Sequence, residues 1–177
     1  ARAVLEALGI AGASDDEQLA AAAAGFDGLP SRCRSLGSVG SVEFVDDGLS
    51  TNVLPAQAAL HAFAARPVAL LVGGHDRMLD YAPLGRTIAE RTAPTLVVTM
   101  PDNGPRIGQA VREATDGRVE VRDAADLDRA VESAFDWAPD GGVVLLSPAA
   151  PSFGRFSDYR ERSAAFAAAA GRLGTLS

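Results

Sequence analysis

From Val42 onward, the chain alternates short runs of β-branched and aliphatic residues with longer stretches of helical periodicity. The predicted strands cover residues 42–45, 68–72, 95–99, 118–121 and 143–146. The predicted helices cover residues 53–65, 82–91, 106–114, 124–137 and 157–172, and Asp123 is the predicted N-cap of the fourth. Such alternation is typical of parallel strands joined by helical crossovers. We therefore predict an α/β fold with a mostly parallel sheet of five to six strands and helices on both faces.

The residues before Val42 follow a different pattern. Residues 1–26 are predicted to form a helix, a turn and a second helix, because apolar residues recur at helical spacing on both sides of a glycine-containing break. Residues 25–41 hold several glycines and a proline with little periodicity, which indicates a linker. The chain begins at Ala1, without methionine and inside a predicted helix, so we interpret it as a segment of a longer protein.

Composition restricts the possible partners. The net charge of −7 argues against nucleic acid, because binding phosphates needs clustered positive charge. No apolar run reaches the length of about 18 residues that a membrane span needs, so we expect no membrane partner. The single cysteine, Cys33, cannot form an internal disulfide, which fits a reducing cytoplasm, and its expected role is that of a small buried hydrophobe.

Polar residues follow the first predicted strand. Asp46 and Asp47 end this strand, and hydroxyl and amide side chains at residues 50–52 lead into the next helix. The carboxyl edge of a parallel sheet is where α/β proteins bind ligands, and the start of a helix suits phosphate or carboxylate. An aspartate at this position also serves as a helix cap or turn former, and the pattern alone leaves both interpretations open.

The second predicted strand leads into Gly73-Gly74-His75-Asp76-Arg77. Paired glycines allow close backbone approach to a ligand, and Arg77 could bind a carboxylate or phosphate with its planar fork; a plain tight turn is the alternative. The architecture is Rossmann-like, but the G-x-G-x-x-G fingerprint is missing. His75 is expected to be a solvated loop residue, and with His61 on a helix and no cysteine nearby, no metal site is predicted.

The fifth predicted strand leads into a run of small residues that contains Ser147 and Ser152. Small side chains let a ligand lie against the backbone, and either hydroxyl can donate a hydrogen bond to it. The G-x-S-x-G nucleophile elbow is missing from the sequence, so we do not predict a serine hydrolase.

Three segments together resemble the C-terminal domain of Mur ligases. Gly28–Arg32 resembles the G-L-P-H-R motif of this family, and Asp46–Asn52 resembles its N-D-S-K-A-T-N motif. Leu145–Phe156, followed by Tyr159-Arg160-Glu161-Arg162, resembles the L-L-S-P-A-x-x-S-x-x-x-F signature. The resemblance covers essentially the whole chain.

The resemblance implies a domain organisation. Residues 1–29 would be the terminal helices of a preceding central ATPase domain with the hinge, and residues 30–177 the C-terminal, glutamate ligase domain. We place the hinge within residues 28–40. The chain has no lysine, so it holds no G-x-x-x-x-G-K-[ST] phosphate loop. The resemblance explains this, because the phosphate-loop lysine of the family belongs to the central domain.

The resemblance also implies a reaction. Such an enzyme uses ATP and Mg²⁺, held mainly by the central domain, to join glutamate to UDP-N-acetylmuramoyl-L-alanine in peptidoglycan biosynthesis in the cytoplasm. The catalytic residues would lie in the central domain of the same parent chain, so the isolated segment is expected to be inactive. Two alternatives stay open: a non-catalytic Rossmann-like nucleotide-binding module, and a relative that adds glutamate-like amines to folate or another acceptor.

Site residues follow from the resemblance, position by position. The residues matching ATP-binding positions are Arg32, towards the phosphates, and Asp47, on the ribose side. The residues matching glutamate-binding positions are Thr51, Arg77, Ser152, Phe153 and Tyr159. Two residues depart from the pattern, since Leu49 replaces the motif's lysine and Arg77 replaces a carboxylate-binding lysine. These departures resemble a less common branch that adds L-glutamate and relies on a separate epimerase, so the handedness of the glutamate is left open between D and L.

Overall fold

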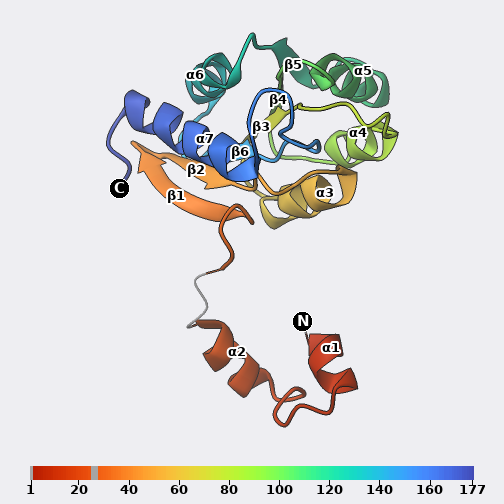
Figure 1. Cartoon of the computed structure of the whole chain (residues 1–177), viewed down its shortest axis with the longest axis vertical. Coiled ribbons are helices and arrows are strands. Elements are labelled where there is room, and N and C mark those ends of the chain that lie inside the picture. The colour runs from red at the N-terminus through yellow and green to blue at the C-terminus, as the bar shows by residue number, and fades with distance from the viewer. Residues whose placement is uncertain (1, 25–27) are drawn as a thin grey trace.

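The computed structural model describes residues 2–24 and 28–177 and contains one six-stranded sheet in the order β1-β2-β6-β3-β4-β5. The strands are β1 (Arg34–Val39), β2 (Val42–Asp46), β3 (Val68–Val72), β4 (Thr95–Thr99), β5 (Glu120–Asp123) and β6 (Val143–Leu146). Strands β2, β6, β3, β4 and β5 run parallel to their neighbours, and only β1 is antiparallel to the strand beside it. Figure 1 shows the sheet between two layers of helices, which confirms the predicted α/β architecture.

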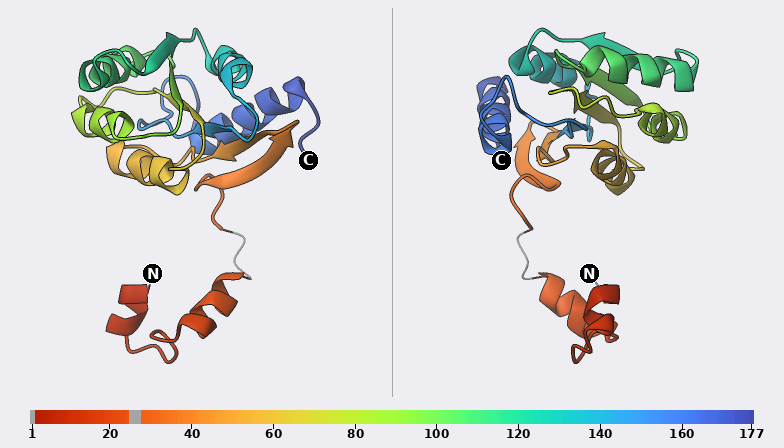
Figure 2. Two further views of the ribbon diagram at one scale, coloured as in Figure 1. Left: turned by 180° about the vertical axis from the view of Figure 1, so that it is seen from behind. Right: turned by 45° about the vertical axis from the view of Figure 1, so that its right-hand side comes forward.

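The helices divide between the two faces of the sheet, as Figure 2 shows. One face packs against α3 (Val53–Ala62), α4 (Ala82–Ala89) and α5 (Gly104–Thr115), and the other against α6 (Leu127–Trp137) and α7 (Tyr159–Leu173). Two short helices, α1 (Arg2–Ala7) and α2 (Asp16–Ala24), precede the sheet and are drawn apart from it in Figure 1. Of the predicted helix–turn–helix over residues 1–26, residues 1, 25 and 26 lie outside the described part. No helix among the described residues is long and apolar enough to cross a membrane.

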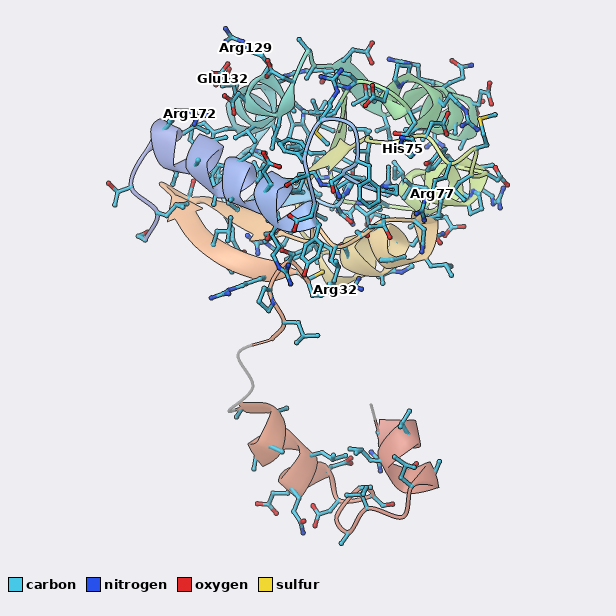
Figure 3. All side chains as sticks on the ribbon, viewed as in Figure 1. Arg32, His75, Arg77, Arg129, Glu132 and Arg172 are labelled. Carbon is cyan, nitrogen blue, oxygen red and sulfur yellow. The ribbon has the colours of Figure 1, made fainter. Side chains whose placement is uncertain are left out.

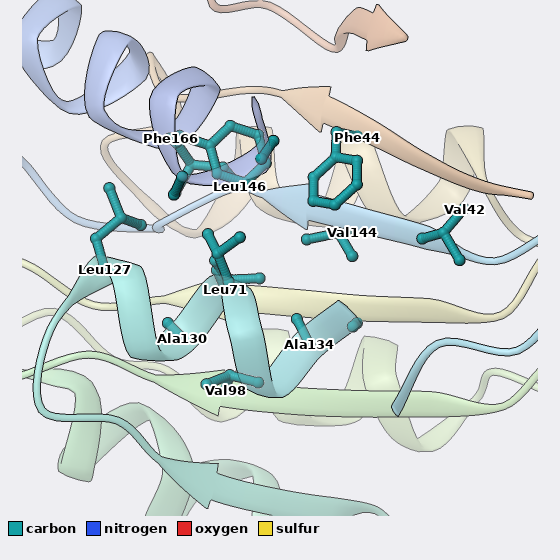
Figure 4. Close-up of a cluster of buried hydrophobic side chains, with 14 of the residues drawn as sticks. Val42, Phe44, Leu71, Val98, Leu127, Ala130, Ala134, Val144, Leu146 and Phe166 are labelled. Atoms are coloured by element: carbon teal, nitrogen blue, oxygen red, sulfur yellow. The ribbon is translucent and has the colours of Figure 1, made fainter. Parts of the chain in front are cut away.

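Alternation along the central strands separates the core into two clusters. In β3, Leu70 and Val72 pack towards α3, α4 and α5, whereas Ala69 and Leu71 pack towards α6 and α7. Figure 4 shows the second cluster, in which Phe44 of β2 lies among aliphatic side chains from β3, β4 and β6 and from both covering helices. All five residues of β3 are buried because helices cover both faces, which is why this strand reads as a continuous apolar run.

Strand β1 corrects the linker prediction for residues 25–41. Residues 34–39 pair antiparallel with β2, with a bulge between Ser35 and Gly37. The strand was missed because it lies at the edge of the sheet, where exposed residues and a glycine at φ 108° leave little apolar alternation. Its outer edge is covered by Ser177, whose backbone exchanges two hydrogen bonds of 3.1 Å with Ser38. The predicted hinge within residues 28–40 is therefore wrong over the strand itself.

Several predicted boundaries shift by a few residues. Strand β5 runs to Asp123, because the pairing of Thr99 with Asp123 extends the ladder past the predicted end. Asp123 is therefore not a helix cap: its carboxylate accepts a hydrogen bond from Thr99 Oγ1 at 2.5 Å. The N-cap of α6 is Asp126, which accepts from the backbone of Arg129 at 2.8 Å. Both aspartates suit a cap locally, and the sheet pairing decides between them.

Candidate functional site

The carboxyl ends of β2, β6 and β3 are neighbours in the sheet, and the chain leaves them in different directions. The loops after β2 and β3 lead to helices on one face, whereas the loop after β6 leads to α7 on the other face. Where neighbouring loops diverge in this way, a crevice opens at the carboxyl edge of the sheet, and ligands of open α/β sheets bind there. The predicted polar residues after β2 and β6 lie at this edge.

Asp47 is the most constrained polar residue of this edge. Its side chain is buried, and its backbone N–H donates to Leu146 O at 2.8 Å. One carboxylate oxygen accepts from Ser147 Oγ at 2.7 Å and the other from the backbone N–H of Cys33 at 3.3 Å. Burial raises the pKa of Asp47, while the hydrogen bonds from Ser147 and Ser50 and the charge of Arg32 oppose the rise. The carboxylate is thus held rigidly at the mouth of the crevice.

Arg32 lies beside Asp47 and is exposed. Its guanidinium makes no hydrogen bond or ion pair with any described residue, so all its donors face solvent or an absent ligand. Figure 3 shows Arg32 near the start of β1, whereas His75 and Arg77 lie beside α4. A free guanidinium beside a fixed carboxylate fits a ligand that carries both phosphate and hydroxyl groups, because the arginine pairs with the phosphate and the carboxylate accepts from the hydroxyl.

Ser50 adds a second unusual group near Asp47. Its side chain is fully buried, and its Oγ has no hydrogen-bond partner among the described residues. This hydroxyl approaches the Asp47 carboxylate closely enough to lower its pKa without completing a well-formed hydrogen bond. A small adjustment of the β2–α3 loop would complete that bond.

Arg162 of α7 joins two loops of the crevice. Its side chain is almost fully buried, and it donates to Gly48 O at 2.8 Å and to Ala150 O at 3.1 Å. Burial lowers the pKa of Arg162 to about 10, with the charge of Asp46 opposing the decrease, so the guanidinium stays protonated at neutral pH. The sequence motif contained this arginine, but its role was not predicted, because both carbonyls are remote in sequence from it.

The glycine pair after β3 packs closely against the β6–α7 loop and also lines a cavity. A Cβ at Gly74, which has φ 154°, would collide with the carbonyl of Pro151 in the β6–α7 loop. Asn103, which is fully buried, accepts from Gly74 N at 2.9 Å and donates to the hydroxyl of Tyr81 at 2.6 Å. The turn after β4 therefore contains an asparagine that fixes the glycine loop, a role that the sequence pattern did not indicate.

Two cavities adjoin the crevice. The first, of about 190 Å³, is lined by residues including Gly73, Met100, Leu127, Ser152, Phe156 and Arg162. The second, of about 620 Å³, is lined by residues including Ser31, Arg34, Asp46, Leu49, Tyr159 and Ser163. The β6–α7 loop and the start of α7 separate them, so the candidate site has two adjoining compartments.

The five predicted glutamate-binding residues do not surround a single cavity. Ser152 lines the first and Tyr159 the second. Thr51 is half-buried directly before the N-cap of α3, and Arg77 and Phe153 are exposed on their loops; these three line neither cavity. Their roles stay predictions. His75 is an exposed loop residue, as predicted, and among the described residues no three His, Cys, Asp or Glu side chains gather as a metal site would require.

Cys33 is exposed, which corrects the prediction of a buried hydrophobe. It sits at φ 45° in the turn before β1, where its neighbours are Arg32 and Asp47. The pKa of its thiol is raised to about 11, first because neighbouring atoms shield the sulfur from water and second because Asp47 is negatively charged. A thiol that stays protonated at neutral pH is a poor nucleophile, which argues against a catalytic role.

We expect Cys33 to react with iodoacetamide at pH 8 about tenfold more slowly than an unperturbed cysteine, because its raised pKa lowers the thiolate fraction more than it raises the nucleophilicity. The rate should keep rising with pH up to about 11. The same chain unfolded in urea supplies the reference rate, since it contains one cysteine. Asp47→Asn should accelerate the folded chain; equal rates for folded and unfolded chains would refute the shifted pKa.

The fold and the crevice define an α/β domain with a candidate anion-binding site at the carboxyl edge of its sheet. Residues 31–150 match the family "Mur ligase, glutamate ligase domain", and the chain belongs to this family. The same residues carry Arg32, Asp47 and the glycine loop.

Proteins of known name resemble the chain over almost its whole length. It is 49% identical over 171 residues to a UDP-N-acetylmuramoyl-L-alanine–L-glutamate ligase of Xanthomonas oryzae, and 46% identical over 169 residues to one of a Micromonospora species. In both comparisons the match covers 96% of this chain and 36% of the relative. The chain thus spans about a third of the length of these relatives.

Solved structures show the same fold at low sequence identity. A murein peptide ligase of Psychrobacter arcticus has a TM-score of 0.54 at 15% identity, covering 86% of this chain and 31% of that one. A folylpolyglutamate synthase of Mycobacterium tuberculosis, complexed with ADP and AMPPCP, also has a TM-score of 0.54 at 15% identity, covering 78% of this chain and 32% of that one. At this identity the likeness supports the fold alone.

Proposed function

We propose that this chain is the C-terminal part of an ATP-dependent ligase that adds L-glutamate to UDP-N-acetylmuramoyl-L-alanine in peptidoglycan biosynthesis. The observation that carries the proposal is the 49% identity, over 96% of the chain, to a relative named for this reaction. Leu49 and Arg77, two of the departures from the D-glutamate motifs, support the L-glutamate branch. The substrates and ATP place the reaction in the cytoplasm.

The domain division is part of the proposal. Residues 1–29 would end the central ATPase domain, and residues 30–177 form the glutamate ligase domain. The hinge then lies before Arg34, because β1 is paired to the sheet from that residue on. Leu49 N donates to Ser31 O at 3.0 Å, so the chain is already attached to the domain at Ser31. Of the predicted hinge at residues 28–40, this leaves residues 28–30 as the proposed hinge.

ATP fits the groups at the mouth of the crevice. The unpaired guanidinium of Arg32 would bind its phosphates, and the buried carboxylate of Asp47 would accept from a ribose hydroxyl. When bound, ATP supplies the phosphoryl group that activates the acceptor carboxylate, and Mg²⁺ neutralises phosphate charge. The described residues contain no cluster that would hold the metal alone, so we assign Mg²⁺ mainly to the central domain. One solved structure with this fold, a bifunctional folylpolyglutamate synthase/dihydrofolate synthase of Yersinia pestis, contains AMPPNP and a Mn ion.

Glutamate would bind on the other side of the crevice. Its two carboxylates need positive charge and hydroxyl donors. Arg77 is exposed on the loop after β3 and forms no ion pair with a described residue, while Thr51 and Ser152 supply hydroxyls from the neighbouring loops. Phe153 and Tyr159 would cover the bound amino acid. Since Ser152 and Tyr159 line different cavities, the proposal includes closure onto the central domain, which would supply the remaining walls of the glutamate site.

The experiment that tests the proposal measures phosphate release by the full-length parent protein with ATP, Mg²⁺ and UDP-N-acetylmuramoyl-L-alanine. L- and D-glutamate are offered separately. We expect turnover with L-glutamate and at least a hundredfold lower rate with D-glutamate. Preference for D-glutamate would sink the branch assignment, and inertness of both would sink the glutamate assignment. The 177-residue chain alone, as the control, should release no phosphate.

A further inference from the structure

Three polar side chains from distant parts of the sequence form a partly buried chain of hydrogen bonds beside Arg32. Ser31 Oγ lies 2.8 Å from Ser163 Oγ of α7, and Ser163 Oγ lies 2.9 Å from Asp46 Oδ1 at the end of β2. Ser31 and Asp46 are each 4% exposed. Since a carboxylate only accepts, Ser163 donates to Asp46, and Ser31 must donate to Ser163. We call these three residues the serine–aspartate chain.

Gly48 leaves the space that the serine–aspartate chain occupies. A Cβ at this position would collide with Ser163 Oγ and lie 2.9 Å from Asp46 Oδ1. The backbone N–H of Gly48 also donates to the same Asp46 oxygen at 2.8 Å. Gly48 stands where the N-D-S-K-A-T-N motif has serine, and Ser31 stands where the G-L-P-H-R motif has histidine. Gly48 and Ser31, which both differ from the family motifs, therefore both lie next to the Ser163 hydroxyl.

The serine–aspartate chain fixes the backbone on one side of Arg32. Ser31 is held at φ 57°, a left-handed conformation that costs free energy for a residue with a side chain. The Ser31 carbonyl accepts from Leu49 N at 3.0 Å. Among the described residues, the Ser31 hydroxyl makes the only side-chain hydrogen bond between the turn before β1 and α7. On the other side of Arg32, Cys33 N donates to Asp47 at 3.3 Å. The residues on both sides of Arg32 are thus held by hydrogen bonds, whereas the Arg32 side chain forms none with a described residue.

We propose that Ser163 and Ser31 are positioning residues that hold Arg32 in place for the nucleotide phosphates, through the hydrogen bonds to Asp46. This inference rests on the proposed function, because it needs Arg32 to contact the nucleotide. Removing the Ser163 hydroxyl leaves the buried Ser31 hydroxyl without a partner and removes the contact that offsets the strained backbone. The Arg32 guanidinium then samples more positions, and nucleotide affinity falls.

The test uses the full-length parent protein with Ser163→Ala, Ser31→Ala and Arg32→Ala. Steady-state kinetics give KM for ATP and for glutamate, and calorimetry gives the affinity for ADP without turnover. We expect Ser163→Ala and Ser31→Ala to raise KM for ATP and Kd for ADP about tenfold and to leave KM for glutamate unchanged, since one net hydrogen bond corresponds to about that factor. Ser41→Ala is the matched control, because it removes the 2.6 Å hydrogen bond from Ser41 to the exposed Asp140. It should change neither KM for ATP nor Kd for ADP.

A general structural effect would give a different result. In an Arg32→Ala background, Ser163→Ala should add less than a twofold further loss of nucleotide affinity, because the group that it positions is gone. Full additivity of the two changes, or a parallel rise in KM for glutamate with a lower Tm, would overturn the inference. The inference would also be overturned if Arg32→Ala weakened ADP binding but Ser163→Ala left the Kd for ADP unchanged. An unchanged Kd in Arg32→Ala itself would instead overturn the proposed role of Arg32, and the positioning inference with it.

Discussion

Replacing Arg162 with methionine is expected to lower the free energy of unfolding of the 177-residue chain by about 2 to 5 kcal/mol. Methionine fills much of the same volume, but it leaves the carbonyls of Gly48 and Ala150 without donors in a buried environment. Each such unsatisfied group costs about 1–3 kcal/mol. Arg162 forms no ion pair with a described residue, but the change also removes its favourable charge interaction with the buried carboxylate of Asp46. Urea unfolding at pH 7 measures the effect.

Arg160→Met is the matched control for this prediction. Arg160 lies on the same helix, and its side chain is 76% exposed. The aspartate oxygen with which it pairs is 3.7 Å away, which makes this a loose ion pair. We expect a change of less than about 0.5 kcal/mol, as for most surface substitutions. In the full-length parent, Arg162→Met should also lower turnover, since the two carbonyls belong to the loops with Asp47 and Ser152. Equal stabilities of the two variants would show that Arg162 does not join those loops.

Asp47→Asn is expected to lower kcat/KM for ATP of the full-length parent about a hundredfold. The amide keeps the shape of the carboxylate but loses the charge, and a hydrogen bond to a charged group contributes about 1.5–3 kcal/mol. Asp140→Asn is the matched control, because it changes an exposed aspartate that also accepts from a serine. Retention of kcat/KM for ATP within threefold would contradict the role given to Asp47.

The stability of Asp47→Asn should follow a different trend. Because burial raises the pKa of Asp47, the folded state holds its proton more tightly than the unfolded state does. The charge of this carboxylate therefore lowers stability as pH rises from the unfolded value of about 4 through the raised folded value. Asparagine carries no charge and so avoids this loss of stability. The variant should therefore be at least as stable as the unsubstituted chain at pH 7, and its gain in stability should be smallest at low pH. Urea unfolding at pH 4 and pH 7 measures this difference in stability. If the variant is less stable than the unsubstituted chain at pH 7, the buried carboxylate does not lower the stability of the folded state.

The central strands and helices were predictable because their burial is complete. Strands β3 and β6 are covered on both faces, so each is a continuous apolar run, and each of the helices α3 to α7 follows one of the parallel strands. Strand β1 was not predictable in the same way, because an edge strand with a bulge needs few apolar residues and draws its definition from pairing with β2. The cap of α6 was misplaced because two aspartates three residues apart are equally suitable locally.

The site was predictable only in part. The resemblance to Mur ligases implied that Arg32 and Asp47 belong to one site, and in the structure the charge of Arg32 acts on Asp47. The functions of Arg162, Asn103 and Ser163 depend on carbonyls, amides and hydroxyls 12 to 132 residues away along the chain, whose positions no local pattern reveals. The two cavities form where the β6–α7 loop passes between other elements, which is a property of the assembled fold.

The direction of β1 has a consequence for the whole enzyme. Because β1 is antiparallel to β2, its first residue, Arg34, lies opposite Asp46, at the same edge of the sheet as Asp47. A parallel first strand would instead begin at the far edge, about 16 Å away for a strand of five residues. The upstream polypeptide therefore joins the sheet at the rim that holds Asp47. In the proposed full-length enzyme, a rotation about this junction would turn the crevice towards or away from the upstream residues.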